Sequence, residues 1–544
     1  MNVKFVTLGC KTNQYETNAM EQSFKNAGYD IDENKKPDIY VVNTCSVTSV
    51  AERKSRQMIR RAKELNKDAI VVVCGCYSQV AKSEIEKIDD VNIIIGINEK
   101  NKIVEIVEDY IKKHRNLKCN LEKRDDINNF KKYADKNNLD KCDGIEKLDK
   151  IEFKDIKCEE VSDVMHDDKF LDFGPTTYTE LTRAYIKIQD GCDRFCSYCI
   201  IPYARGRVRS REPESILNEI TEVAKKGIKE VVLTGIHIAS YGKDFSDKNE
   251  NSTDEHMDIS DEQKENCDEY GKDDLHLSES GLRSKGKDEL HLSESRLRSK
   301  EGDELHLSKS KSRSKEEDDL HSGSYRLIDL LEQINKIDGI ERVRLGSIEP
   351  KLINKEFVER LSKLDKICHH FHLSLQSGCD GTLKRMNRRY TTAEFEQSAK
   401  MLRNAFDDVH LTTDIIVGFP GETEKEFETT YEFLKKIKFY KTHIFKYSPR
   451  RGTAAEKMPN QVDGKIKEER SKTLIELSNK NELDYNQSYI GKDIAVLIEE
   501  KEGDFYKGHT GNYILSKVKS DKDIVNKIVK VRVYNAEEEF VEAK

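Results

Sequence analysis

The stretch Tyr185–Cys199 reads YIKIQDGCDRFCSYC and joins a strand-like segment to a loop rich in cysteine. The first part is typical of a β-strand, because it combines β-branched and aromatic residues and ends at a glycine. The second part places thiols at Cys192, Cys196 and Cys199, with no fourth cysteine nearby. A structural zinc site takes four ligands. The stretch therefore predicts a strand that carries an incomplete set of metal ligands at its end.

Similar strand-like segments follow this one along the chain. They read EVVLTGI, RVRLGSI, FHLSLQSG, DIIVGF and HIFKYS, and helical patterns lie between them. Strands that alternate with helices indicate a parallel sheet. Six strand–helix units predict a partial (β/α)6 barrel over residues 181–455, interrupted after its second strand by residues 244–323.

The chain on either side of this barrel predicts two further domains. Apolar runs rich in β-branched residues (VKFVTL, DIYVVNT, AIVVVCG and VNIIIGI) alternate with helical patterns over residues 1–115. This alternation predicts a small doubly wound α/β domain, whose parallel sheet is covered on both faces. After a linking helix at 456–484, the short strands of 485–544 predict a small all-β barrel of the sort that binds RNA.

Two polar stretches separate these domains. The whole chain has a net charge of −8, and residues 244–323 alone have about −11. The remainder of the chain therefore has a net charge near +3. A decayed repeat recurs there with a period of 15 residues, at Leu275, Leu290, Leu305 and Leu320. Such a composition buries too little apolar surface to fold, so we expect a dispensable segment that loops out of the barrel. Residues 116–180 form a second polar linker, and we expect free thiols at its Cys119, Cys142 and Cys158.

The composition of the chain points to the cytoplasm. Its 544 residues include no apolar run near the roughly 18 residues that span a bilayer, and the start MNVKFVTLGC lacks the pattern of a signal peptide. Cytosolic thiols stay reduced. Some of the 13 cysteines are therefore expected to be metal ligands rather than parts of disulfides.

A second group of three cysteines lies in the N-terminal domain. Cys10 ends the first predicted strand, Cys45 ends the second and Cys76 lies just past the third. The carboxyl ends of parallel strands share one edge, so these thiols are expected to converge. The alternative is that each is a small buried apolar residue. Cys74 and Cys76 point to opposite faces if the strand continues, and we favour Cys76 because it lies at the loop.

The loop after the first barrel strand suits an iron–sulfur cluster. The spacing C-x3-C-x2-C supplies three thiolates to a cubane whose four irons each need an outer ligand. Three cysteines leave one iron open, and that iron is free to bind a small molecule. The alternative is a zinc site that borrows a distant fourth ligand.

This loop resembles the signature of the radical S-adenosylmethionine (SAM) superfamily. The resemblance rests on the spacing of Cys192, Cys196 and Cys199 and on Tyr198 before the third cysteine. It implies that the open iron chelates SAM and that an electron from the cluster cleaves SAM to a 5′-deoxyadenosyl radical. The three cysteines are then the catalytic ligands.

Nearly the whole chain outside the two polar stretches resembles the methylthiotransferases of that superfamily. The motifs are GCKTNQYET at 9–17, NTCSVT at 43–48 and GCYSQ at 75–79, together with a C-terminal barrel similar to a TRAM domain. The resemblance implies that Cys10, Cys45 and Cys76 hold an auxiliary [4Fe–4S] cluster. The enzyme would then contain two [4Fe–4S] clusters and use SAM.

The N-terminal motifs, with Lys11 after the first cysteine, look most like the subgroup that acts on N6-threonylcarbamoyladenosine next to the anticodon of tRNA. The resemblance then implies conversion of this nucleoside to its 2-methylthio derivative. Isopentenyladenosine in tRNA and an aspartate of a ribosomal protein are the alternative substrates. An RNA-binding iron–sulfur redox sensor is the alternative of another class.

Polar and glycine residues at the carboxyl ends of the barrel strands are the expected contacts for SAM, since barrels place their ligands there. They are Thr234, Gly235, Ser347, Glu349, Gln376, Asp414 and Gly418, with Tyr198 from the cysteine loop. A local turn or helix cap is the alternative role for each of them.

Two groups of residues are expected to contact RNA. The first is an alternating basic row, suited to phosphates, at Arg205, Arg207, Arg209 and Arg211. The second lies in the C-terminal barrel at Lys507, His509 and Tyr513. The target adenine has to leave its stack to reach the barrel, as base-modifying enzymes generally require. The expected partners are the anticodon stem-loop of tRNA and an electron donor of unknown identity, with no membrane partner.

Overall fold

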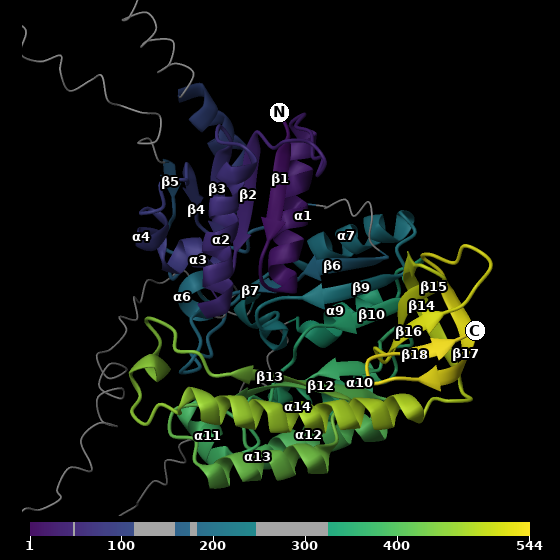
Figure 1. The fold of residues 1–544 in the computed structure, drawn as a ribbon. Coiled ribbons are helices and arrows are strands. Elements are labelled where there is room, and N and C mark those ends of the chain that lie inside the picture. Colours follow the sequence, from purple (N-terminus) through teal and green to yellow (C-terminus); the bar gives the residue numbers. More distant parts are fainter. Residues whose placement is uncertain (47–48, 114–157, 175–181, 246–324) are drawn as a thin grey trace, which may run out of the picture. The chain divides into compact units, whose positions relative to one another are not determined.

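Five parallel strands form the N-terminal sheet of the computed structural model (Figure 1). The structure describes residues 1–46, 49–113, 158–174, 182–245 and 325–544. The sheet has the order β1-β2-β3-β4-β5, and its strands are β1 (Val3–Thr7), β2 (Ile39–Thr44), β3 (Ile70–Gly75), β4 (Ile93–Ile95) and β5 (Cys158–Glu160). The helical segments between them are α1 (Lys11–Asn26), α2 (Ser49–Leu65), α3 (Cys76–Val80), α4 (Lys82–Ile85) and η1 (Lys100–Lys102).

Both faces of this sheet are buried, as the apolar runs predict. Val41, Val72 and Ile93 contribute to a core that includes Phe24 of α1. Alternate residues such as Val42 contribute to a second core on the other face. The sequence did not predict the fifth strand, because Cys158 was expected in a polar linker. The other two residues of the strand, Glu159 and Glu160, are exposed, so the strand has no apolar run that would predict it.

Six parallel strands form the central domain, as the sequence predicts. They are β6 (Arg183–Lys187), β9 (Glu230–Thr234), β10 (Arg342–Leu345), β11 (His370–His372), β12 (His410–Val417) and β13 (Lys441–Lys446). Strands β10-β9-β6 form one sheet and β11-β12-β13 another. Isolated bridges such as that between Ile348 and Leu373 join them into one series. This is a partial (β/α)6 barrel.

Helices cover the outer side of this series. They include α7 (Pro213–Lys225), α9 (Leu327–Ile334), α10 (Lys355–Leu361), α12 (Thr392–Ala405) and α13 (Glu424–Ile437). In β6, Ala184 and Ile186 belong to the core beneath the helices. Side chains alternate along a strand, so Tyr185 and Lys187 lie on the inner side of the barrel. Helix α1 of the N-terminal domain packs against β6.

A long helix and a small closed barrel complete the chain. Helix α14 (Gly464–Gln487) packs against β13 and leads into the barrel. The barrel strands are β14 (Asp493–Glu502), β15 (Phe505–Thr510), β16 (Leu515–Val518), β17 (Ile528–Ala536) and β18 (Val541–Ala543). They close in the order β14-β15-β16-β18-β17. The predicted linking helix and all-β barrel are thus both present.

Within the described part of the chain, every helix is too short or too polar to cross a bilayer. The repeat of residues 244–323, apart from its first two residues, lies outside the described residues, as do Cys119 and Cys142.

His410 predicts how acid affects the stability of the fold. This side chain of β12 is buried, stacks on Tyr440 and lies 3.0 Å from the hydroxyl of Tyr489 through its Nε2. Burial lowers the pKa of His410 to about 3, against about 6.5 in an unfolded chain. A histidine that is buried neutral contributes stability above pH 6.5 and loses it as the pH falls toward 3. At pH 5 the expected loss is about 2 kcal/mol.

The measurement is urea unfolding of wild type and of His410→Gln at about pH 7.5 and pH 5. We expect the variant to lose about 2 kcal/mol less stability than wild type between the two pH values. His166→Gln is the control, because the side chain of His166 is 87% exposed. An equal acid-induced loss in wild type and His410→Gln would contradict the prediction.

Candidate functional site

The three N-terminal thiols predicted to converge do lie at one edge of the sheet. Cys10 is the N-cap of α1, Cys45 follows β2, and Cys76 is the first residue of α3. A Cβ atom added to Gly9 would lie 2.9 Å from the sulfur of Cys45, so the loop that carries Cys10 passes directly over Cys45. A charge on Cys10 would also raise the pKa of Cys76.

Two glycines make this convergence possible. Gly9 precedes Cys10 with φ of +112°, and Gly75 precedes Cys76 with φ of +104°. A Cβ atom on Gly75 would collide with the backbone of Thr44. Only glycine adopts such angles at little cost and lets two backbones approach this closely. The pattern Gly-Cys thus has a structural reason at both positions.

The structure separates Cys74 from Cys76. Cys74 is fully buried among apolar side chains of the N-terminal core, including Val72 and Met20. Burial raises its pKa to about 11. The sulfur of Cys76, in contrast, accepts a hydrogen bond from Nε of Arg205 at 3.3 Å. Burial raises the pKa of Cys76 as well, but the charge and the hydrogen bond of Arg205 oppose that rise.

The second group of cysteines lies in the loop after β7 (Gln189–Asp190). The loop is held in place by its own backbone, by Gly206 at the end of α6 (Ile201–Arg205) and by the segment after α11 (Asp380–Arg385). Cys192 N donates to Gly206 O at 3.0 Å, Cys199 N donates to Cys196 O at 2.9 Å, and Ser197 N donates to Met386 O at 3.1 Å. Burial raises the pKa of Cys192 to about 11 and that of Cys199 to about 12. The loop therefore gathers three thiols, and burial opposes ionisation at two of them.

Arg388 lies against this loop. Its Nη1 donates to the sulfur of Cys196 at 3.2 Å, and its other side faces the carboxylate of Glu349 at 3.4 Å. Glu349 also pairs with Arg194 at 2.6 Å and His237 at 3.3 Å. Burial would raise the pKa of Glu349, but His237 and the two arginines lower it to about 2. Glu349 is thus an ionised residue that orients cations around the cysteine loop.

The number of thiols in each group fits an iron–sulfur cubane. The four irons of a cubane each need an outer ligand, and three cysteines leave one iron open. Thiolates are also ligands of zinc. A structural zinc site, however, takes four ligands, and each group supplies three cysteines.

All but one of the barrel residues expected to contact SAM lie at the carboxyl ends of the strands. Thr234 ends β9 and Gly235 follows it, Ser347 and Glu349 follow β10, Gln376 follows β11, and Gly418 follows β12. Gln376 N donates to Asp414 O, and Gln376 adopts φ of +69°. Tyr198 packs edge-on against Phe419, which follows Gly418. The structure thus brings Tyr198, Glu349 and the cysteine loop together. Asp414 lies deeper in the barrel, paired with His372.

The prediction that the arginine row contacts RNA is wrong for three of its four members. Arg205, Arg209 and Arg211 are buried. Arg211 pairs with Glu219 and Asp172, and Arg209 donates to Asn98 Oδ1 at 3.0 Å. These side chains satisfy internal carboxylates and carbonyls, so none is available to a phosphate. Arg207 is exposed and lies 3.5 Å from Asp193.

The prediction for the C-terminal barrel needs a similar correction. Tyr513 stacks between His509 and His370 of β11, with centroid distances of 4.8 and 4.6 Å. His509 pairs with Glu499, and its carbonyl accepts from Arg342. His509 and Tyr513 therefore attach this barrel to the central domain instead of facing RNA. Lys507 is partly exposed and pairs with Glu502 at 2.6 Å.

A buried ion network that sequence reasoning missed joins the two cysteine groups. Glu16 accepts from Lys100 at 2.5 Å, from Lys187 at 2.7 Å and from Arg205 at 2.7 Å. Lys187 and Arg205 also donate to Asp190. Burial would raise the pKa of Glu16, but the three cations hold it well below its usual range. The signal was the glutamate of the QYE motif, an acidic residue on a helix face that the fold buries.

Comparison with known proteins identifies the family. Residues 2–96 match the model of "Uncharacterized protein family UPF0004", and residues 186–284 and 316–434 match that of the "Radical SAM superfamily". Among solved structures, the methyltransferase TsrM from Kitasatospora setae has a TM-score of 0.46 at 12% identity, over 92% of this chain and 79% of that chain. That similarity is too weak to support an argument about this chain.

Curated relatives match over nearly the whole chain. The sequence is 33% identical to the threonylcarbamoyladenosine tRNA methylthiotransferase MtaB of Bacillus subtilis, over 98% of this chain and 94% of the relative. Identity to the MtaB protein of Aquifex aeolicus is 32%, over 98% and 100%. Identity to the tRNA-2-methylthio-N(6)-dimethylallyladenosine synthase of Alkaliphilus oremlandii is 29%, over 97% and 89%. The chain therefore belongs to the radical SAM methylthiotransferase family.

Proposed function

We propose that this enzyme converts N6-threonylcarbamoyladenosine, next to the anticodon of tRNA, to its 2-methylthio derivative. The observation that carries the proposal is the pair of three-cysteine groups, one on the N-terminal sheet and one on the barrel, joined through Arg205 and Asp190. The relatives with the highest identity given above act, by name, on threonylcarbamoyladenosine. This choice of substrate also agrees with Lys11 in the N-terminal motif.

The two cysteine groups would each hold a [4Fe–4S] cluster. Cys192, Cys196 and Cys199 would hold the first beside SAM, and Cys10, Cys45 and Cys76 the second. When bound, these groups supply a carbon radical able to remove hydrogen from C2 of adenine, a sulfur atom and a methyl group. Adenine C2–H is too weakly acidic for a side-chain base, so the substrate itself calls for radical chemistry.

The chain's own residues position these groups. Arg388 donates to the sulfur of Cys196, and Glu349 holds Arg388 and Arg194 around the loop. Arg205 does the same for Cys76 while it pairs with Glu16 and Asp190. Hydrogen bonds to ligand sulfurs are among the features that set the potential of such a cluster.

The proposed partner is the anticodon stem-loop of tRNA. Unpaired loop bases are the usual targets of proteins that read RNA by sequence, and an unstacked adenine can enter the barrel. Of the predicted RNA contacts, the side chain of Arg207 is exposed and that of Lys507 is partly exposed. Residues 1–115 would hold the auxiliary cluster, and residues 181–455 would bind and cleave SAM. Residues 485–544 would provide part of the RNA-binding surface. The proposed setting is the cytoplasm, with an electron donor supplied there.

The direct test is mass spectrometry of tRNA nucleosides from cells with and without the gene. We expect the methylthio group to be lost from threonylcarbamoyladenosine alone. Loss from isopentenyladenosine instead would change the assigned substrate. Unchanged tRNA would refute the proposal, and the modification of a ribosomal protein would then be measured in the same cells.

The two neighbouring cysteines of the N-terminal domain give a matched pair of variants. We expect Cys76→Ala to abolish methylthio transfer and to lower the iron content by one cluster, while SAM cleavage to 5′-deoxyadenosine continues. Cys74→Ala removes a core sulfur and should leave transfer intact, with a stability loss of about 1 kcal/mol. The reverse outcome would show that Cys74 is the ligand.

A further inference from the structure

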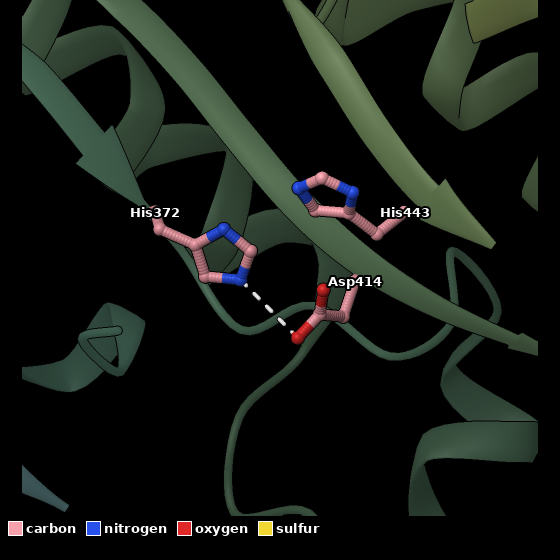
Figure 2. A group of neighbouring side chains, drawn as sticks. All are labelled: His372, Asp414 and His443. Carbon is pink, nitrogen blue, oxygen red and sulfur yellow. Dashed lines mark ion pairs between the residues drawn. The ribbon is translucent and has the colours of Figure 1, made fainter. Parts of the chain in front are cut away.

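The inner face of the barrel carries a group of polar side chains that the cysteine loops do not use. His372 of β11, Asp414 of β12 and His443 of β13 lie next to one another (Figure 2). His372 Nε2 is 3.2 Å from Asp414 Oδ2, and the two imidazole rings stack with centroids 5.9 Å apart. Asp414 and His443 are register partners in the sheet. His443 is exposed, so the group is open to a ligand.

Lys11 belongs to the same region. It is the first residue of α1, and its ammonium lies 5.8 Å from the centre of the Tyr185 ring on the inner side of β6. Its charge also acts on His443 and on His370 of β11. Lys11 is exposed, and within the described residues no carboxylate lies within 4.0 Å of its Nζ. Lys11 thus differs from Arg183 and Arg344, which both pair with Glu230.

The surrounding charges favour an anion over a metal ion. Glu230 is already paired with Arg183 and Arg344. The donor atoms of His372, Asp414 and His443 lie within 4.8 Å of one another, as a metal would require. A divalent cation there would nevertheless face the charge of Lys11, whereas an anion would complete an ion pair with it.

The substrates named for the two kinds of relative differ in the charge and polarity of their N6 substituent. The N6 substituent of threonylcarbamoyladenosine bears a carboxylate, a hydroxyl and amide N–H groups, while a dimethylallyl group is a hydrocarbon. A carboxylate matches the unpaired ammonium of Lys11, and hydroxyl or N–H groups match Asp414 and His443. A hydrocarbon would offer no partner to the ammonium of Lys11, and sites that pair with a polar group of the substrate discriminate strongly against ligands that lack it.

We propose that Lys11, Asp414 and His443 form the subsite for the N6 substituent of the target adenine, in which Lys11 pairs with a carboxylate of that substituent. The inference rests on the proposed function, since it names the part of that substrate which the barrel recognises. It also gives Lys11 a role distinct from that of the adjacent ligand Cys10: Lys11 selects the substrate, and Cys10 holds the cluster.

The test uses the reconstituted holoenzyme and two anticodon stem-loop RNAs. One carries threonylcarbamoyladenosine, and the other carries its methyl ester, which replaces the negative charge with a neutral ester and adds one methyl group. For wild type, Lys11→Met and Lys11→Arg, the dissociation constant is measured without reductant, and KM and kcat are measured under turnover. Lys25→Met, at the exposed end of the same helix, is the matched control. Iron content and the visible spectrum report on both clusters.

Lys11→Met is expected to weaken binding of the acid RNA and to raise its KM, each by about tenfold or more. Its effect on the ester should be about twofold or less, and Lys11→Arg should restore most of the affinity for the acid. An equal loss on both RNAs, or a loss of iron in Lys11→Met, would overturn the subsite. Wild type that cleaves SAM but modifies neither RNA would instead refute the proposed function. Zinc bound stoichiometrically by wild type and lost in His443→Ala would replace the anion site with a metal site.

Discussion

The buried carboxylate of Glu16 is the constraint on which the rest of the site depends. It accepts hydrogen bonds from Lys100 of its own domain and from Lys187 and Arg205 of the central domain. All of these side chains are fully buried. Removing one member of such a network leaves charges without compensation, which typically costs about 3–5 kcal/mol. The network therefore fixes the N-terminal sheet on the barrel in one arrangement.

This arrangement connects the two cysteine groups by short steps. Arg205 donates to the sulfur of Cys76 on one side and to Asp190 on the other. Asp190 in turn accepts from the backbone of Gly191, the residue before Cys192. The same helix α1 that supplies Glu16 begins at Lys11, directly after Cys10. One helix thus begins beside a proposed cluster ligand and carries both the residue proposed to select the substrate and the carboxylate that joins the domains.

Much of the fold and of the cysteine sites was predictable from local patterns. Apolar runs rich in β-branched residues predicted the parallel strands of both domains, because such strands are buried on both faces. Cys10 and Cys76 each follow a glycine at the end of a predicted strand. Their thiols were therefore expected to converge, because the carboxyl ends of parallel strands share an edge. The short strand at Cys158 escaped, since it carries exposed glutamates and pairs only at the edge of the sheet.

The fate of charged side chains was not predictable in the same way. Arg205, Arg209 and Arg211 have the spacing of an RNA-binding row, and only the tertiary structure shows that carboxylates from distant segments bury them. His509 and Tyr513 likewise face the central domain. A local pattern records that charges are present, while their partners lie up to about 200 residues away along the chain.

The central claim is that the Glu16 network makes two cysteine groups act on one substrate. Its most direct test is the ratio of methylthiolated RNA to 5′-deoxyadenosine formed by Glu16→Gln, compared with wild type of equal iron content. The account predicts that the variant still cleaves SAM but that this ratio falls by about tenfold or more, because the neutral amide no longer holds Lys187 and Arg205. An unchanged ratio in a folded variant with both clusters would contradict it.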